Sequence, residues 1–262
     1  MLDLIQITKI FNKGTLNEKT ALDDVSLHLN NGDFTTVIGG NGAGKSTLLN
    51  AIAGSFLVDK GRIFLDETDI TFLQEHRRAK NIGRLFQDPL KGTAPNMTIE
   101  ENMALAYGRG QKKSAGIGIS KAQRDLFREK LSELNLGLED RMKSKMGLLS
   151  GGQRQAVTLL MATLSTPKLL LLDEHTAALD PATAEKVISL TNSIVNREHI
   201  TTLMITHNME DALKYGNKTM IMKDGKIIAL IEGEKREKMT VDELIHLYST
   251  SANEYSDKVL LR

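Results

Sequence analysis

Three short segments of the chain combine glycine, hydroxyl, lysine and carboxylate residues at spacings suited to phosphate chemistry. They are GGNGAGKST at Gly39–Thr47, LSGGQ at Leu149–Gln153 and LLLLDEH at Leu169–His175. Glycines allow a backbone to wrap closely around an anion, and lysine supplies a positive charge. Carboxylates can hold a metal ion or polarise water. Together the segments indicate a site that binds and hydrolyses a nucleotide.

The segment Gly39–Ser46 has the pattern G-x-x-x-x-G-K-S and lies between an expected strand, Phe34–Ile38, and an expected helix, Lys45–Ala53. A glycine-rich turn followed by a chance Lys-Ser pair would explain neither this spacing nor this context. We expect Lys45 to reach the β- and γ-phosphates and Ser46 to bind Mg²⁺. Thr47 is placed to bond a phosphate oxygen. The expected ATP-binding residues of the loop are Gly39, Gly40, Asn41, Gly42, Ala43, Gly44, Lys45, Ser46 and Thr47.

Two acids follow the apolar run Leu169–Leu172, which is typical of a strand buried on both faces of a parallel sheet. Asp173 is expected to hold the water shell of Mg²⁺, because this ion keeps several waters and takes few protein ligands. Glu174 is the candidate catalytic residue that polarises the attacking water. A solvated loop would also carry two acids. Their position after an apolar strand, in a chain with a phosphate loop, favours the catalytic interpretation.

The segment Leu149–Gln153 predicts a second phosphate-binding helix N-terminus. Ser150 is a good N-cap for an expected helix at Arg154–Leu164, and the two glycines permit close approach of a ligand. One nucleotide site already has its phosphate loop. The simplest hypothesis is therefore that Ser150–Gln153 serves the nucleotide held by another subunit.

In order and spacing these motifs resemble those of the ATP-binding cassette (ABC) ATPases, and the resemblance covers nearly the whole chain. Gly39–Ser46 resembles Walker A, Leu169–Asp173 resembles Walker B, and LSGGQ resembles the family signature. The resemblance implies that Gln87 in LFQDP senses the γ-phosphate and the metal. It also implies that His207 in ITHNM is a catalytic switch residue that contacts the γ-phosphate, although a lone histidine is more often a core or capping residue.

The resemblance extends these assignments to a metal site and to a subunit interface. The implied metal ligands are Ser46, Gln87 and Asp173, the last through water. The implied signature loop, acting in trans, is Leu149, Ser150, Gly151, Gly152 and Gln153. The implied D-loop, which crosses the dimer interface, is Ala178, Leu179 and Asp180.

The same resemblance implies cofactors and partners. ATP and Mg²⁺ are the implied cofactors, and a head-to-tail homodimer or pair of cassettes is expected to enclose two ATP molecules. The chain resembles the importer-type subunit, which drives a separate integral-membrane permease and works with an extracytoplasmic substrate-binding protein. Its expected location is cytoplasmic, on the inner face of the cell membrane. The string DEHTAALD resembles a subgroup associated with amino-acid-type binding proteins.

Two other classes of protein share some or all of these motifs. A non-transport or export-type cassette, for iron–sulfur assembly or lipoprotein release, would carry the same motifs. A monomeric P-loop kinase or GTPase would leave LSGGQ and His207 unexplained. Nucleic acid is not an expected partner, because the net charge of +1 gives no sign of a large basic surface.

Two positions are less typical of the family. His175 stands where the family usually has proline, and a tolerated substitution is a simpler interpretation than a catalytic histidine. Phe11 is the best candidate to stack on adenine, since aromatic faces stack on bases, although it would also suit a core position.

The elements expected around these motifs define an α/β protein with a P-loop NTPase core. We expect a mixed, largely parallel sheet, an N-terminal antiparallel β subdomain and an inserted helical subdomain. Residues 1–87 and 166–262 are expected to form the core and residues 88–165 the helical part of a single ABC ATPase domain over 1–262. Ser120–Leu136 is a predicted helix, Gly108–Gly118 a predicted loop, and Thr240 with Glu243 a capping box for a short last helix.

Composition restricts the remaining possibilities. The chain has no cysteine, which excludes disulfides and thiolate metal sites. Its N-terminus, MLDLIQITKI, lacks the basic start and apolar core of a signal peptide, and its apolar runs are far shorter than the roughly 20 residues of a membrane span. We therefore expect a membrane role to depend on a partner.

Overall fold

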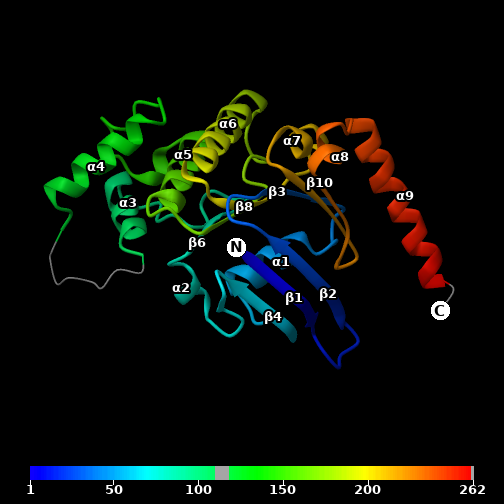
Figure 1. The fold of residues 1–262 in the computed structure, drawn as a ribbon. Coiled ribbons are helices and arrows are strands. Elements are labelled where there is room, and N and C mark those ends of the chain that lie inside the picture. Colours follow the sequence, from blue (N-terminus) through cyan, green and yellow to red (C-terminus); the bar gives the residue numbers. More distant parts are fainter. Residues whose placement is uncertain (110–117, 261–262) are drawn as a thin grey trace. The chain divides into compact units, whose positions relative to one another are not determined.

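The computed structural model describes residues 1–109 and 118–260, and side-chain surroundings as far as residue 250. The chain divides into two compact units (Figure 1). Unit 1 comprises Met1–Arg78 and Thr201–Arg262, and unit 2 comprises Ala79–Ile200. Most of the predicted loop at Gly108–Gly118 lies outside the described residues.

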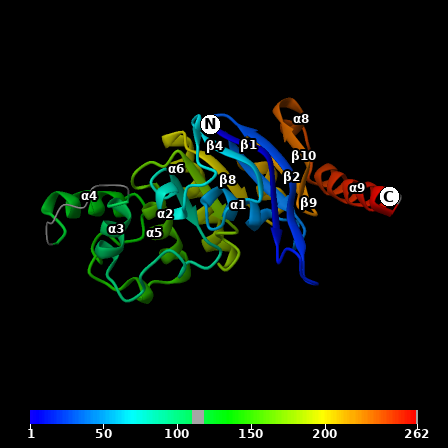
Figure 2. The ribbon, with the colours of Figure 1, turned by 90° about the horizontal axis from the view of Figure 1, so that it is seen from below.

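Unit 1 begins with the predicted antiparallel sheet, whose strand order is β2-β1-β4-β5. Figure 2 shows β1, β2 and β4 side by side. Leu2, Leu4 and Ile7 of β1 are buried, because one face of the sheet covers the core. A register shift between Leu4 and Ile7 interrupts the alternation of buried and exposed residues. The strands are β1 Leu2–Phe11, β2 Lys19–Leu29, β4 Lys60–Leu65 and β5 Thr68–Asp69.

A second set of strands in unit 1 is mostly parallel. Strand β3 pairs in parallel with β8 and with β9, and β10 pairs antiparallel with β9 through a turn at Asp224-Gly225, a dipeptide typical of hairpins. Because β3 and β8 are parallel neighbours, their carboxyl ends lie at the same edge. The strands are β3 Phe34–Gly39, β8 Thr201–Ile205, β9 Lys218–Lys223 and β10 Lys226–Glu232.

The helices of unit 1 confirm one prediction and correct another. Helix α1, Lys45–Ala53, has the predicted bounds and ends at Gly54, whose φ of 83° is left-handed. The prediction of a short last helix is wrong, since α9 runs over 20 residues, Val241–Leu260. Its first turn carries the predicted capping box, with Thr240 N donating to Glu243 Oε2 at 2.8 Å. The shorter helices are α2 Glu75–Arg78, α7 Met209–Lys214 and α8 Gly233–Glu237.

Helix α9 is longer than expected because no glycine or proline stops it, and its apolar residues have a surface to cover. Leu244 is fully buried against Ile38 and Ile221 of the parallel strands. Leu247 and Tyr248 pack on the same cluster. Tertiary packing therefore supports the first two turns of this helix.

Unit 2 combines two parallel strands with the predicted helical segment. Its elements are β6 Ile82–Leu85, α3 Ile99–Tyr107, α4 Lys121–Ser132, the 3₁₀-helix Met146–Leu148, α5 Gly151–Thr163, β7 Leu169–Asp173 and α6 Pro181–Glu198. Phe127 and Leu131 of α4 are fully buried, as the helical pattern predicts. Helix α4 is shorter than the predicted Ser120–Leu136, because the backbone turns into a left-handed conformation at Asn135.

Unit 2 is larger than the predicted helical segment at residues 88–165. The strands β6 and β7 and helix α6 belong to it, since α5 packs against both β6 and α6. Within the described residues, none of the helices has the length and apolar character needed to cross a bilayer.

Candidate functional site

The loop between β3 and α1 has the backbone geometry of an anion cradle. Gly42 and Gly44 have left-handed φ values of 80° and 98°, which favour glycine. A Cβ on Gly39 would lie 2.4 Å from the carbonyl oxygen of Met222, so no larger residue fits there. The loop then enters α1, whose N-terminal N–H groups carry the positive end of the helix dipole.

Lys45 lies over this loop rather than pointing into solvent. Its side chain is 5% exposed, and Nζ donates to the carbonyl oxygens of Gly39 at 2.7 Å and Gly40 at 3.0 Å. Asn41, Gly42 and Ser46 are exposed at the rim, and Thr47 is half-buried. The phosphate loop thus carries the buried ammonium group of Lys45 and the exposed polar side chains of Asn41 and Ser46.

The outer side of the loop is fixed by a distant turn. Gly225 N donates to Ala43 O at 3.1 Å, and Asp23 N donates to Gly225 O at 2.9 Å. A Cβ on Gly44 would lie 2.7 Å from Ala21 O, which requires glycine at this position. The turn between β9 and β10 therefore holds the shape of the phosphate loop.

His207 lies beside the phosphate loop within unit 1. Strands β3 and β8 pair in register with Val37 opposite Ile205, and Thr206 N continues this pairing by donating to Val37 O at 3.2 Å. His207 follows directly and is exposed. The sequence places a titratable side chain at the strand end next to the one that opens the loop.

Phe11 ends β1 and is 37% exposed, so it is not a core residue. Its ring meets Phe56 edge to face at a centroid distance of 5.3 Å, and Lys9 Nζ lies 5.5 Å from its centroid. These contacts fix the position of the ring, and the Lys9 ammonium lies over one of its faces.

The predicted residues of unit 2 gather at the carboxyl ends of β6 and β7. These parallel strands pair with Leu85 opposite Leu172, so Gln87 and Glu174 each come two residues beyond the same rung. Asp173 and Glu174 are half-buried and Gln87 is exposed. Glu174 has a left-handed φ of 47°, and Ala177 N donates to its carbonyl oxygen at 3.0 Å. A non-glycine residue in this conformation costs roughly 1–2 kcal/mol, which the turn must offset.

The signature segment forms the predicted helix N-terminus. Ser150 Oγ accepts from Gln153 N, and Gln153 Oε1 accepts from Ser150 N at 3.2 Å, which completes a capping box. Leu149 is buried below it. The Gln153 side chain therefore caps its own helix, α5. The backbone N–H groups that belong to the first turn of this helix are those of Gly151 and Gly152.

The signature segment and the D-loop meet within unit 2. A Cβ on Gly151 would lie 3.3 Å from Leu179 Cδ2, and one on Gly152 would lie 2.0 Å from Thr183 Cγ2. Asp180 caps α6, with Thr183 N donating to its Oδ1 at 3.1 Å, and this hydrogen bonding lowers the pKa of Asp180. The glycines are thus also required for the close packing of α5 on α6.

Two residues that support these segments were not singled out from sequence. Arg154 donates to the carbonyl oxygens of Met146, Gly147 and Leu149 and so fixes the approach to the signature. Asn102 is 1% exposed and bonds the backbone of Ala94, Met97 and Thr98 in the segment after Gln87. Asn102 shares the buried side of α3 with Ile99, Met103 and Ala106, and a polar residue in this apolar pattern was the available signal.

His175 proves to be a buried neutral residue. It is 3% exposed, and Nε2 lies 3.2 Å from Thr191 Oγ1 on α6. Thr191 Oγ1 itself donates to Val187 O at 2.8 Å, so it accepts from His175 and assigns the proton to Nε2. Burial lowers the pKa of His175 to about 4. The histidine therefore anchors the turn that carries Glu174.

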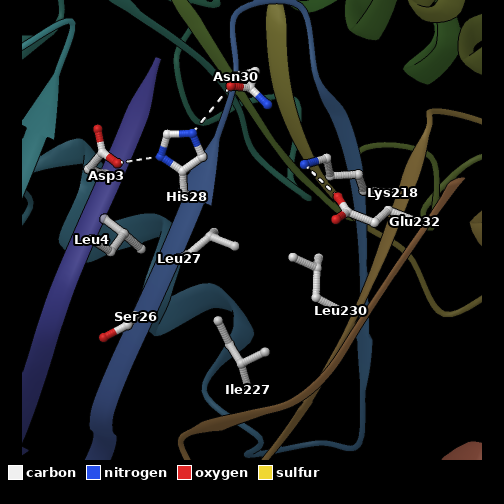
Figure 3. Close-up of a pocket in the computed structure, with 10 residues that line it drawn as sticks. All are labelled: Asp3, Leu4, Ser26, Leu27, His28, Asn30, Lys218, Ile227, Leu230 and Glu232. Atoms are coloured by element: carbon white, nitrogen blue, oxygen red, sulfur yellow. Dashed lines mark hydrogen bonds and ion pairs between the residues drawn. The ribbon is translucent and has the colours of Figure 1, made fainter.

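Unit 1 also has a groove of about 510 Å³ between β2 and β10 (Figure 3). His28 Nδ1 lies 2.5 Å from Asp3 Oδ1, and the hydrogen bond that the protonated imidazole donates to the Asp3 carboxylate raises the pKa of His28. Lys218 Nζ lies 2.7 Å from Glu232 and 3.0 Å from Asp33. The charged side chains that line this groove pair with one another, and none of the lining residues belongs to the phosphate loop.

The donor set determines which metal chemistry is available. No cluster of three or more His, Cys, Asp or Glu residues that would hold a metal occurs in the part of the chain that the structure describes. Ser46 and Asp173 instead offer single oxygen donors. Within its own unit, each is the type of ligand that Mg²⁺ takes, since this ion binds through one or two protein oxygens together with substrate phosphates.

Comparison with known proteins identifies the family of the chain. The family model described as ABC transporter matches residues 22–177. The chain is 40% identical over 251 residues to the tyrosine transport ATP-binding protein of Clostridioides difficile (strain R20291), covering 95% of this chain and 98% of that one. It is 34% identical to the methionine import ATP-binding protein MetN of Streptococcus pneumoniae (strain ATCC BAA-255 / R6), covering 87% of this chain but only 63% of MetN.

Solved structures give the same result. The ATP-binding cassette MJ0796, in a dimeric post-hydrolysis state bound to ADP and Pi, matches with a TM-score of 0.75 and 28% identity over 88% of this chain and 98% of that one. The cassette MJ1267 of an ABC transporter matches with a TM-score of 0.77 and 29% identity over 93% and 95%. Fold and motifs define a nucleotide-hydrolysing cassette. The chain belongs to the ABC transporter family, as an ATP-binding and ATP-hydrolysing subunit.

Proposed function

We propose that the chain powers the uptake of an amino-acid-like solute through a separate integral-membrane permease. The observation that carries this proposal is the 40% identity, along 95% of the chain, to a protein named for tyrosine transport. Methionine import proteins match over most of the chain as well. An extracytoplasmic substrate-binding protein is the expected source of solute, and the permease would hold the chain at the inner face of the membrane.

Within this function, the phosphate loop and Lys45 bind the triphosphate and Phe11 stacks on adenine. Mg²⁺ would be held by Ser46, Asp173 through water, and Gln87, and when bound it supplies charge neutralisation at the phosphates. Glu174 polarises the attacking water, and His207 contacts the γ-phosphate. The side-chain types support these roles, since Lys45 carries a cation, Glu174 and Asp173 carboxylates, and His207 an imidazole.

We further propose that two copies act together around two ATP molecules. The capped helix start at Ser150–Gln153 is a second anion-binding end, and one nucleotide already has the loop before α1. The D-loop residues Ala178, Leu179 and Asp180 adjoin that helix start and would line the same interface. A dimeric relative with ADP and Pi supports this arrangement.

Glu174→Gln tests the catalytic assignment. The variant should bind ATP normally, lose at least about 100-fold in turnover, and accumulate as an ATP-dependent dimer, because water activation fails while the loop persists. Turnover and size-exclusion chromatography with ATP measure the two effects. Lys45→Ala is the matched control, since it should lose ATP affinity and fail to dimerise. Turnover by Glu174→Gln near the parent rate would remove Glu174 from its role.

Uptake in the source cells tests the transport assignment. Cells without the chain should take up labelled tyrosine or methionine more slowly, and the parent chain but not Glu174→Gln should restore uptake. Labelled glucose is the control solute. Unchanged amino-acid uptake, with ATPase activity intact in the purified protein, would favour a non-transport or export-type cassette.

A further inference from the structure

A second lysine lies at the phosphate loop besides Lys45. Lys19 opens β2, and its backbone pairs directly with that of Phe11 at the end of β1. Directly opposed residues of an antiparallel pair have Cβ atoms about 5 Å apart. Lys19 is therefore a cross-strand neighbour of the aromatic residue proposed to stack on adenine.

The ammonium of Lys19 reaches the rim of the loop. A Cβ built on Gly42 would lie 3.8 Å from Lys19 Nζ, and Gly42 is exposed, with a left-handed φ of 80°. Lys45 Nζ lies on the carbonyl groups of Gly39 and Gly40 in the same loop. Two ammonium groups thus border one short stretch of backbone, although they come from different elements.

An exposed lysine at a strand end often has a simpler role, namely to form an ion pair or to keep a sheet edge soluble. Other lysines of unit 1 form such pairs: Lys9 lies 3.4 Å from Asp59, and Lys226 lies 3.0 Å from Asp23. Within residues 1–109 and 118–250, no ion pair is formed by Lys19. Its charge is directed at the loop and not at a carboxylate.

We propose that Lys19 is a nucleotide-binding residue that contacts the phosphate chain on its adenosine side. This inference rests on the proposed function. The base is expected on Phe11 and the terminal phosphates at Lys45, so a cation between these two points meets the phosphates nearest the ribose. Lys19 would then contribute to the binding of ADP as well as ATP, whereas a contact to the terminal phosphate would favour ATP alone.

Nucleotide titrations of Lys19→Met test the proposal. Binding of ATP, ADP and adenosine is measured calorimetrically without metal, at low and high salt. The variant should bind ATP and ADP about fivefold more weakly, as expected for one exposed charge pair, and adenosine equally well. Lys19→Arg should restore most of the affinity, and high salt should reduce the difference. Lys13→Met is the control. Lys13 lies in the connection between β1 and β2, and this variant should bind nucleotides like the parent.

Two results would overturn the proposal. One is parent-like affinity of Lys19→Met for both ATP and ADP. The other is an equal loss for adenosine, which would indicate damage to the Phe11 region instead of a missing phosphate contact. A failure of the proposed transport function looks different, because amino-acid uptake would then not depend on the chain, while the parent chain would still bind ATP and the Lys19 titrations would keep their meaning.

Discussion

His175 makes the stability of this protein depend on pH in a way that a single substitution should remove. The ring is buried, neutral and bonded to Thr191, and burial lowers its pKa from 6.5 to about 4. In the unfolded chain the same ring titrates at its ordinary pKa of about 6.5. Below this pH the unfolded state binds a proton that the folded state does not accept, so the free energy of unfolding falls as pH falls.

The magnitude follows from the difference between the two pKa values. Each unit of pKa difference is worth about 1.4 kcal/mol, so the full effect between pH 6.5 and pH 4 is about 3 kcal/mol. At pH 5, still above the folded pKa, the loss from this ring should be about 2 kcal/mol relative to pH 7. His175→Gln retains an N–H donor for Thr191 but does not titrate in this range.

Urea unfolding of the parent and of His175→Gln at pH 7, 6 and 5 measures the effect. The parent should lose about 2 kcal/mol more than the variant between pH 7 and pH 5. The raised pKa of His28 acts in the opposite direction, favouring the folded state below its ordinary pKa, but it is common to both proteins and cancels. Parallel pH profiles for the two proteins would refute the buried, neutral state of His175.

Two further substitutions test the packing around the site. Gly152→Ala should destabilise the protein by about 1–3 kcal/mol in urea unfolding, because its methyl group would lie 2.0 Å from Thr183 Cγ2. Adding Thr183→Ser, which removes that methyl group, should recover most of the loss, and strictly additive losses would contradict the contact. Arg78→Met should cost about 3 kcal/mol, since the guanidinium is 2% exposed and donates to four backbone carbonyl groups. The exposed neighbour Arg77→Met should be nearly neutral, and equal effects of the two changes would argue against this role.

Local signals made much of the fold predictable. Helix α1 begins and ends as predicted, because a glycine-rich loop opens it and Gly54 closes it. Helix α6 starts at Pro181 behind the N-cap Asp180, and the Asp224-Gly225 turn joins β9 to β10. In each case the residues that determine the boundary are neighbours in sequence.

Features that depend on distant partners were not predictable in the same way. The contact between Lys19 and the phosphate loop depends on a register between β1 and β2 that contains irregularities. The role of His175 depends on Thr191, 16 residues away on another element. The packing of the first turns of α9 depends on the apolar cluster around Leu244. No local pattern encodes these pairings, because each forms only when the strands and helices pack.

The hydrogen bond from Gly225 to Ala43 has a consequence for the newly made chain. The turn that supports the phosphate loop is encoded some 180 residues after it. During synthesis from the N-terminus, the loop, helix α1 and Lys45 leave the ribosome long before that support exists. A nascent chain therefore lacks this support for the phosphate loop until the β9–β10 hairpin has emerged.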